Sequence, residues 1–199
     1  YMFLYHSQLA AARKLMSSGA LGELRLIRVA FGFPRRGGED FRYQKDLGGG
    51  ALLDCGGYPV RLALELLGPN VRVIQAHLVQ PEGYEVDLYG NAVMEGENGL
   101  CAQLSFGMDN AYQCQLEVWG SKATLTAPRI FTAGSELKPP LYLKTSAGEE
   151  SLELEADDQF GGSLREFQRL VGKEEHRAAQ RNMIRTQMKQ VQAIMEWRK

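Results

Sequence analysis

The sequence predicts an α+β fold built around a mostly antiparallel sheet. Between Val71 and about Glu155, short runs of alternating apolar and polar residues are separated by turn residues, as is typical of an antiparallel meander. Segments with helical periodicity lie on both sides of this region. The 199 residues, 44% hydrophobic and 24% charged, fit one domain that spans residues 1–199 and buries a core.

The first elements follow from apolar patterns and helix boundaries. The apolar run Tyr1–Tyr5 predicts a strand or the end of one. Ser7–Ser18 begins with a cap-forming serine and stops at Gly19, which predicts a helix. Leu24–Phe31 alternates as a strand does. Pro34–Gly50 is rich in glycine and charge and predicts a long loop, which in a compact domain is more often functional than idle.

A helix is expected to follow this loop, from about residue 51 to Leu67, and to end at Gly68-Pro69. The meander then follows, with a hairpin turn at Asn98-Gly99, where both residues tolerate positive φ. The predicted strands are Val71–Val79, Val86–Glu95, Leu100–Phe106, Gln113–Trp119, Ala123–Ala127, Leu141–Thr145 and Ser151–Glu155.

Two helices are predicted at the end of the chain, over Asp158–Val171 and from Glu174 to about Trp197. Each carries an apolar stripe, and we expect the stripe of the last helix to pack on the sheet with its charges facing solvent. The stripes consist of Phe160, Leu164, Phe167 and Leu170, and of Ile184, Met188, Val191 and Met195.

Composition argues against several classes of function. The formal charge of -1 and the pI near 6.4 provide no basic face for nucleic acid. No apolar run approaches the length of a membrane helix. Three cysteines without a CxxC spacing, and three scattered histidines, predict neither a disulfide framework nor a metal site. Reduced thiols fit a cytoplasmic protein.

Asp54 and Tyr58 are the candidate catalytic residues. If they lie on one helix, their four-residue spacing puts a carboxylate and a phenol on one face, at the end of a glycine-rich loop. The phenol can donate a proton to a sugar hydroxyl or carbonyl, whereas the carboxylate accepts. Arg42, Tyr43 and Gln44 could line a polar pocket beside this pair.

The sequence is also compatible with purely structural roles for these residues. Asp54 could accept hydrogen bonds from loop amides, and Tyr58 could pack with its hydroxyl at the surface. Arg42, Tyr43 and Gln44 could be solvated loop residues. Asp157-Asp158-Gln159 is interpreted first as a helix cap and second as a substrate contact through Gln159.

The glycine-rich stretch is not a dinucleotide fingerprint. If Gly48 opened a GxGxxG motif, its third glycine would fall on Leu53, and no Gly-Lys-Ser/Thr follows. No cofactor-binding residue is therefore predicted within the chain.

Several segments, taken in order, resemble the C-terminal domain of the Gfo/Idh/MocA oxidoreductases. They are LGELRLIRVAF, FRYQKDLGGGALLDCGGYPVRLALELLG, GLCAQLSFGM, VWGSKATL and DDQF, and they occur in a consistent order across nearly the whole chain. Within the family, the chain is most similar to the NDP-hexose 3-ketoreductases, on the sugar ketoreductase branch.

The resemblance implies an open, predominantly antiparallel sheet with helices packed on one face, as in the C-terminal domain of glyceraldehyde-3-phosphate dehydrogenase. It also implies an N-terminal Rossmann domain, absent from this chain, that binds NAD or NADP. Homodimers or homotetramers would form through the open face of the sheet. The family roles of substrate orientation and proton donation fall on Asp54 and Tyr58.

The resulting hypothesis is an NAD(P)-dependent oxidoreductase that acts on a ketone or secondary alcohol of a sugar or nucleotide sugar. The chain starts at Tyr1, inside an apolar run, and is interpreted as a fragment that is inactive alone. The alternative is a non-catalytic module for dimerisation and ligand binding.

Overall fold

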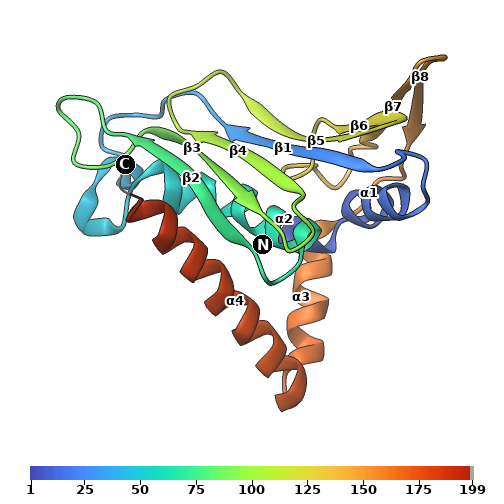
Figure 1. Ribbon diagram of the computed structural model, residues 1–199. Helices are drawn as coiled ribbons and strands as arrows, with labels where there is room; N and C mark the ends of the chain where they lie inside the picture. Colours follow the sequence, from blue (N-terminus) through green and yellow to red (C-terminus); the bar gives the residue numbers. More distant parts are fainter. Residues whose placement is uncertain (198–199) are drawn as a thin grey trace. The chain divides into compact units, whose positions relative to one another are not determined.

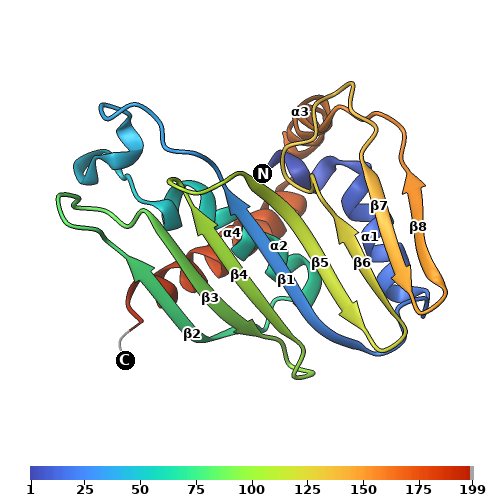
Figure 2. The same cartoon turned by 90° about the horizontal axis from the view of Figure 1, so that it is seen from above.

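The eight strands form one sheet, in the order β2-β3-β4-β1-β5-β6-β7-β8 (Figures 1 and 2). The structure is a computed structural model that describes residues 1–197. Every strand pair with a resolved register is antiparallel, which confirms the predicted meander. The strands are β1 (Leu24–Gly32), β2 (Arg72–Val79), β3 (Tyr89–Glu95), β4 (Cys101–Gly107), β5 (Gln113–Gly120), β6 (Ala123–Ala127), β7 (Pro140–Thr145) and β8 (Gly148–Glu153).

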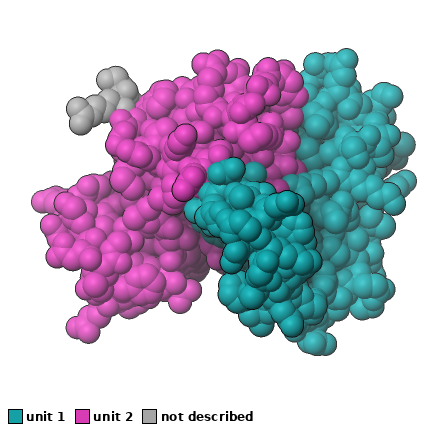
Figure 3. All heavy atoms as spheres, turned by 90° about the horizontal axis from the view of Figure 1, so that it is seen from below, with its two compact units in different colours: residues 1–26, 114–184 teal, residues 27–113, 185–199 magenta. Residues whose placement is uncertain are grey.

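The chain divides into two compact units, which Figure 3 colours separately. Unit 1 comprises residues 1–26 and 114–184, and unit 2 comprises residues 27–113 and 185–199. The four α-helices are α1 (Ser7–Ser17), α2 (Gly57–Leu67), α3 (Gln159–Leu170) and α4 (Glu174–Met195).

Unit 2 packs α2 and the end of α4 against its strands. The inward residues of β3 and β4 alternate with exposed ones, and Ala92, Met94, Ala102 and Leu104 are almost completely buried. On α4, the Gln187 side chain donates to the Gly57 carbonyl at 3.2 Å. This bond fixes the last helix to the first turn of α2.

Unit 1 has its own core beside β5 and β6. The short 3₁₀ helix Met2–Tyr5 places Phe3 edge-on against Phe131, with 5.0 Å between the ring centroids. The prediction of a strand for Tyr1–Tyr5 is therefore wrong. Five apolar residues do not distinguish a buried strand from a buried helical turn, and here burial of Phe3 decides in favour of the turn.

The cap of α3 agrees with the sequence prediction, whereas the cap of α1 differs from it. Asp158 caps α3 as predicted, because its carboxylate accepts from the amides of Phe160 and Gly161. Ser7 was expected to cap α1, but His6 does so by accepting from the Gln8 amide at 3.1 Å. The Ser7 amide donates instead to Asp157, at 2.7 Å.

Except for β6, the strands differ from the predicted bounds by one to three residues at one end or both. β3 begins at Tyr89 instead of Val86, because Leu88 donates to the carbonyl of Val79 and the residues before it form part of a loop. β8 begins earlier, at Gly148. In the β3–β4 turn, Gly99 has φ +76°, and no other residue type has positive φ in the described chain, so Asn98 contributes a side-chain bond to the Leu100 amide.

The apolar stripes of α3 and α4 are largely exposed. On α3, Phe160, Leu164 and Phe167 are 60 to 70% exposed, because the helix packs on the 3₁₀ turn through its opposite side. A Cβ at Gly162 would lie 3.0 Å from the Tyr5 Cβ, so a larger residue there would require Tyr5 to shift by a few tenths of an ångström. On α4, Val191 and Ile194 are buried, whereas Ile184, Met188 and Met195 are not, so the predicted packing of the whole stripe on the sheet is wrong.

We expect substitution of a buried apolar residue to lower the free energy of unfolding much more than substitution of an exposed one. Leu62 of α2 is fully buried, so Leu62→Ala should lower the free energy of unfolding by about 2–5 kcal/mol through lost contacts and a residual cavity. Leu164→Ala, on the exposed side of α3, should change it by less than about 0.5 kcal/mol. Urea denaturation of both variants measures this. An equal loss at Leu164 would show that the α3 stripe is covered in solution.

Candidate active site

The helix that carries Asp54 and Tyr58 begins with a contact from a distant segment. Asp87 binds the first turn twice: its carbonyl accepts from the Ala51 amide at 2.8 Å, and its carboxylate accepts from the Leu52 amide at 2.7 Å. Helix starts leave amides without partners, and Asp87 satisfies two of them. Gly50 has φ +117°, and a Cβ there would lie 2.5 Å from the Asp87 carboxylate.

A π-helical turn over Leu52–Gly56 separates this start from α2. Asp54 lies inside the π turn, and Tyr58 lies in the first turn of α2, so the pair spans the change of helix type. Single π turns inside helices are frequent at functional sites. Asp54 and Tyr58 are both half-buried, and the Tyr58 ring lies 5.0 Å from the ring of Phe31 on β1.

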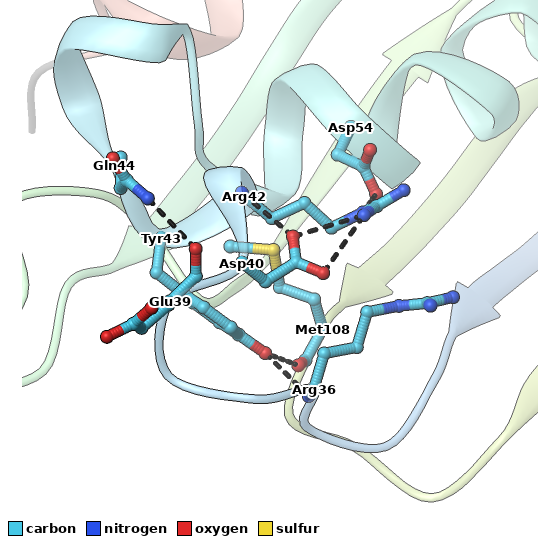
Figure 4. A network of polar contacts seen from close by, with 8 residues as sticks. All are labelled: Arg36, Glu39, Asp40, Arg42, Tyr43, Gln44, Asp54 and Met108. Atoms are coloured by element: carbon cyan, nitrogen blue, oxygen red, sulfur yellow. Dashed lines mark hydrogen bonds and ion pairs between the residues drawn. The ribbon is translucent and has the colours of Figure 1, made fainter.

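Arg42 joins the loop to Asp54 (Figure 4). Its Nε donates to the Asp54 carboxylate at 2.9 Å, and its Nη1 donates to Asp40 at 3.1 Å. The Asp40 carboxylate also accepts from the Arg42 amide, and this backbone bond is the main reason that the pKa of Asp40 is lowered. The structure therefore brings Arg42 and Asp54 together and holds the guanidinium between two carboxylates.

Tyr43 and Gln44 form bonds within the same loop. The Tyr43 hydroxyl accepts from the Arg36 amide at 2.9 Å and donates to the Met108 carbonyl at 3.2 Å, and its side chain is nearly buried. Gln44 is exposed, and its side-chain amide donates to the backbone carbonyl of Glu39 at 3.0 Å (Figure 4). In the structure, Tyr43 is a tether between the loop and the end of β4.

Gln159 belongs to unit 1, whereas the other candidate residues belong to unit 2. Its side chain is 2% exposed and donates to the Ala133 carbonyl at 2.8 Å. Its role as a substrate contact stays a prediction.

Burial and negative charge act on two further groups beneath the site. Burial raises the pKa of the Cys55 thiol to about 12, and the charges of Asp54 and Asp87 add to this. Burial also raises the pKa of Asp87, although its bond from the Leu52 amide opposes the shift. Cys55 is thus a protonated thiol, whose Sγ donates to the Ala51 carbonyl.

The glycines of the loop do not form a phosphate cradle. The amides of Gly48, Gly49 and Gly50 donate at 2.9 Å to the carbonyls of Lys45, Gln44 and Arg42 respectively. A dinucleotide cradle requires such amides to point at the ligand. The glycine amides of this loop therefore do not fit the diphosphate of a dinucleotide.

Two hollows lie in unit 2, and neither Asp54 nor Tyr58 is among their lining residues. One, of about 490 Å³, lies beside the start of β2 and the β3–β4 turn. The other, of about 430 Å³, is lined by residues that include Gly32, Gly90 and Gly107. Among residues 1–197, no group of three or more His, Cys, Asp or Glu could hold a metal ion, and no helix is long and apolar enough to cross a membrane.

Residues 9–126 match the family described as the GFO/IDH/MocA C-terminal domain. The chain belongs to the GFO/IDH/MocA family. This confirms the family resemblance of the sequence, and the open, mostly antiparallel sheet confirms the expected fold.

Relatives of this GFO/IDH/MocA domain are named as reductases of a nucleotide sugar. The chain is 37% identical, over 88% of its length, to the dTDP-3,4-didehydro-2,6-dideoxy-alpha-D-glucose 3-reductase of Actinomadura kijaniata. It is 39% identical, over 86% of its length, to the reductase of the same name from Streptomyces violaceoruber. The chain spans about half the length of these relatives, 53% and 50%.

A solved structure shows the same fold. A 3-ketoreductase from Actinomadura kijaniata, in complex with NADP and TDP-benzene, superimposes with a TM-score of 0.91 at 35% identity. The match covers 98% of this chain and 60% of that one. NADP is thus a ligand of a close structural relative.

Sequence reasoning missed two carboxylates of this GFO/IDH/MocA domain. Asp40 could have been found, because an aspartate directly before a helical turn is a favoured cap. Asp87 gave no such signal, because it lies in a predicted strand and 35 residues separate it from Leu52.

We expect Asp87 to be required for the start of this helix. Asp87→Ala leaves the Leu52 amide without its acceptor and should cost about 1–3 kcal/mol, whereas Asp87→Asn keeps an acceptor and should cost less. Because the pKa of Asp87 is raised on folding, its ionisation opposes folding as the pH rises from about 3.8. Relative to the wild type, Asp87→Asn should therefore gain stability over this rise.

Urea denaturation across the acid range measures this difference. Asp109→Asn is the control, because Asp109 is exposed in the turn after β4 and should show no such gain. A pH-independent difference between Asp87→Asn and the wild type would contradict the assignment.

Proposed function

We propose that this chain is the substrate-binding domain of an NADP-dependent oxidoreductase that reduces a ketone of a nucleotide sugar. Tyr58 is the proton donor, and Asp54 orients the substrate. The observation that carries the proposal is the pair itself: a half-buried phenol and a half-buried carboxylate on one helix, with the carboxylate held by Arg42. The names of the relatives support the substrate class.

The roles of the two side chains follow from their chemistry. Reduction of a ketone needs a hydride, which a nicotinamide supplies, and a proton, which a phenol can donate. Asp54 is paired with Arg42 and acts as an acceptor for a sugar hydroxyl. We place the binding of the cofactor mainly in a separate nucleotide-binding domain, because the loop glycines of this chain use their amides internally.

Tyr58→Phe tests the assignment in the protein encoded by the complete reading frame. We expect kcat/KM for a dTDP-linked ketosugar with NADPH to fall about 10²- to 10⁴-fold, the usual contribution of a general acid. The melting temperature should be unchanged. Tyr142→Phe, which removes the same hydroxyl from β7 in unit 1, is the matched control and should keep full activity.

The 199-residue chain alone should show no turnover under the same conditions. Full activity of Tyr58→Phe would remove this residue from the mechanism. Activity of the isolated chain would place the cofactor site inside it. A complete protein without reductase activity, but with affinity for the nucleotide sugar, would favour the non-catalytic binding module.

We also propose that copies of the protein pair through the face of the sheet that the helices leave open, and that the protein is cytoplasmic. In unit 2 this face carries Tyr89, 41% exposed, beside the hollow of about 430 Å³. Exposed aromatic residues around a hollow are typical of subunit interfaces.

Sedimentation equilibrium of Tyr89→Arg tests the pairing. The added charge in the hollow should weaken association at least tenfold, and Glu82→Arg, in the exposed turn after β2, should leave it unchanged. Equal association of both variants would place the interface elsewhere.

A further inference from the structure

Two exposed arginines of the loop after β1 lie over aromatic rings. The Arg35 guanidinium carbon is 5.3 Å from the centre of the Tyr84 ring and 6.0 Å from that of Tyr43. The Arg36 guanidinium carbon is 5.0 Å from the centre of the Phe33 ring. Contacts of this kind restrain a guanidinium through its flat face. The N–H donors at its edge remain available to a ligand.

The charges of these two arginines are not neutralised by ion pairs. Within residues 1–197, neither guanidinium lies within ion-pair distance of a carboxylate. Arg42 differs, because it is paired with both Asp40 and Asp54. One cation between two carboxylates does not attract an anion. If an anionic part of a substrate binds at this loop, Arg35 and Arg36 are therefore better suited to it than Arg42.

The position of Arg36 is fixed relative to the candidate active site. Its amide donates to Tyr43, whose hydroxyl donates to the Met108 carbonyl after β4. Its charge is near enough to Asp40 to contribute to the lowered pKa of that carboxyl, after the larger effects of Arg42. In Figure 4 the Arg36 guanidinium extends to the same side of the loop as the Arg42 guanidinium and the Asp54 carboxylate.

We propose that Arg35 and Arg36 bind the diphosphate of the nucleotide sugar whose sugar ring lies beside Asp54 and Tyr58. This inference rests on the proposed function. Guanidinium groups match the geometry of phosphate oxygens and form charge-assisted bonds with them. In a nucleotide sugar that is reduced at carbon 3, the diphosphate on carbon 1 is linked to the same ring. The diphosphate must therefore lie close to the proton donor. Arg36 is linked to this part of the site, because its charge acts on Asp40, and Arg42 pairs with both Asp40 and Asp54.

Steady-state kinetics of the complete protein with Arg35→Gln and Arg36→Gln combined tests this. KM for a dTDP-linked ketosugar should rise at least tenfold, while kcat should change less than twofold, since the lost contacts bind ground and transition states equally. Arg35→Lys with Arg36→Lys should recover part of the loss. Arg72→Gln is the control, because Arg72 is exposed on β2 of the same unit and paired with Glu95.

Calorimetric binding of dTDP separates this inference from the proposed function, because it needs no turnover. A Kd at least tenfold higher for the Gln double variant than for the wild type and Arg72→Gln supports the diphosphate site, even if the protein reduces no sugar. Normal turnover with unchanged KM and Kd in the double variant overturns the site and leaves the proposed function intact. Absence of both dTDP binding and turnover in the wild type overturns both.

The fold of the variants is checked by thermal melting. Both arginines are exposed, so the Gln double variant should melt at the temperature of the wild type. If it melts lower, the Lys double variant provides the comparison, and a normal KM and Kd in that variant with a normal melting temperature would support a site that needs only positive charge.

Discussion

The bond from the Leu52 amide to the Asp87 carboxylate is the contact on which the candidate site depends. It fixes where the helix starts, and every later residue of the helix takes its position from that start. Asp87 can approach this closely because Gly50 has no side chain. The half-buried carboxylate is partly removed from water, which disfavours its charge, so the fold maintains this contact against a cost of desolvation. Precise placement of Asp54 and Tyr58 is what the contact achieves.

Arg42 has a different task from the one that its charge suggests. An arginine in a loop beside a candidate active site is an obvious candidate for a substrate phosphate. Here, however, its donors are directed at Asp40 and Asp54, and its guanidinium lies 4.5 Å from the centre of the Phe41 ring. It therefore fixes the Asp54 carboxylate as an acceptor and joins the loop to the helix. The paired Arg42 thus holds the site together, whereas the unpaired Arg35 and Arg36 are the arginines that we propose for the ligand.

Much of the fold could be predicted from the sequence because alternation and turn residues act locally. The bounds of β6 were predicted to the residue, and Asp158 was identified as a cap. Predictions from local patterns were wrong where a contact between residues far apart in the sequence determines the structure. Met2–Tyr5 is helical because Phe3 packs on Phe131, far along the chain. The stripe of α3 has the periodicity of a buried face, yet the side with the small residues is the one that packs.

The candidate site shows the same division. Asp54 and Tyr58 follow from their spacing, and Arg42 follows from its place in the loop before them. Asp87 could not be found, since no short-range pattern links residues 35 positions apart. The π turn was also unforeseen, because the residues of Leu52–Gly56 are compatible with an ordinary helical turn.

That wide turn has a mechanical consequence. The π turn joins two segments that are held by hydrogen bonds. The start of the helix is held at Leu52 by Asp87, and the first turn of α2 is held at Gly57 by Gln187. The direction of Asp54 follows the first anchor, and that of Tyr58 follows the second. The angle between the Asp54 and Tyr58 side chains can thus be adjusted by small changes at either end, without repacking the core beneath α2.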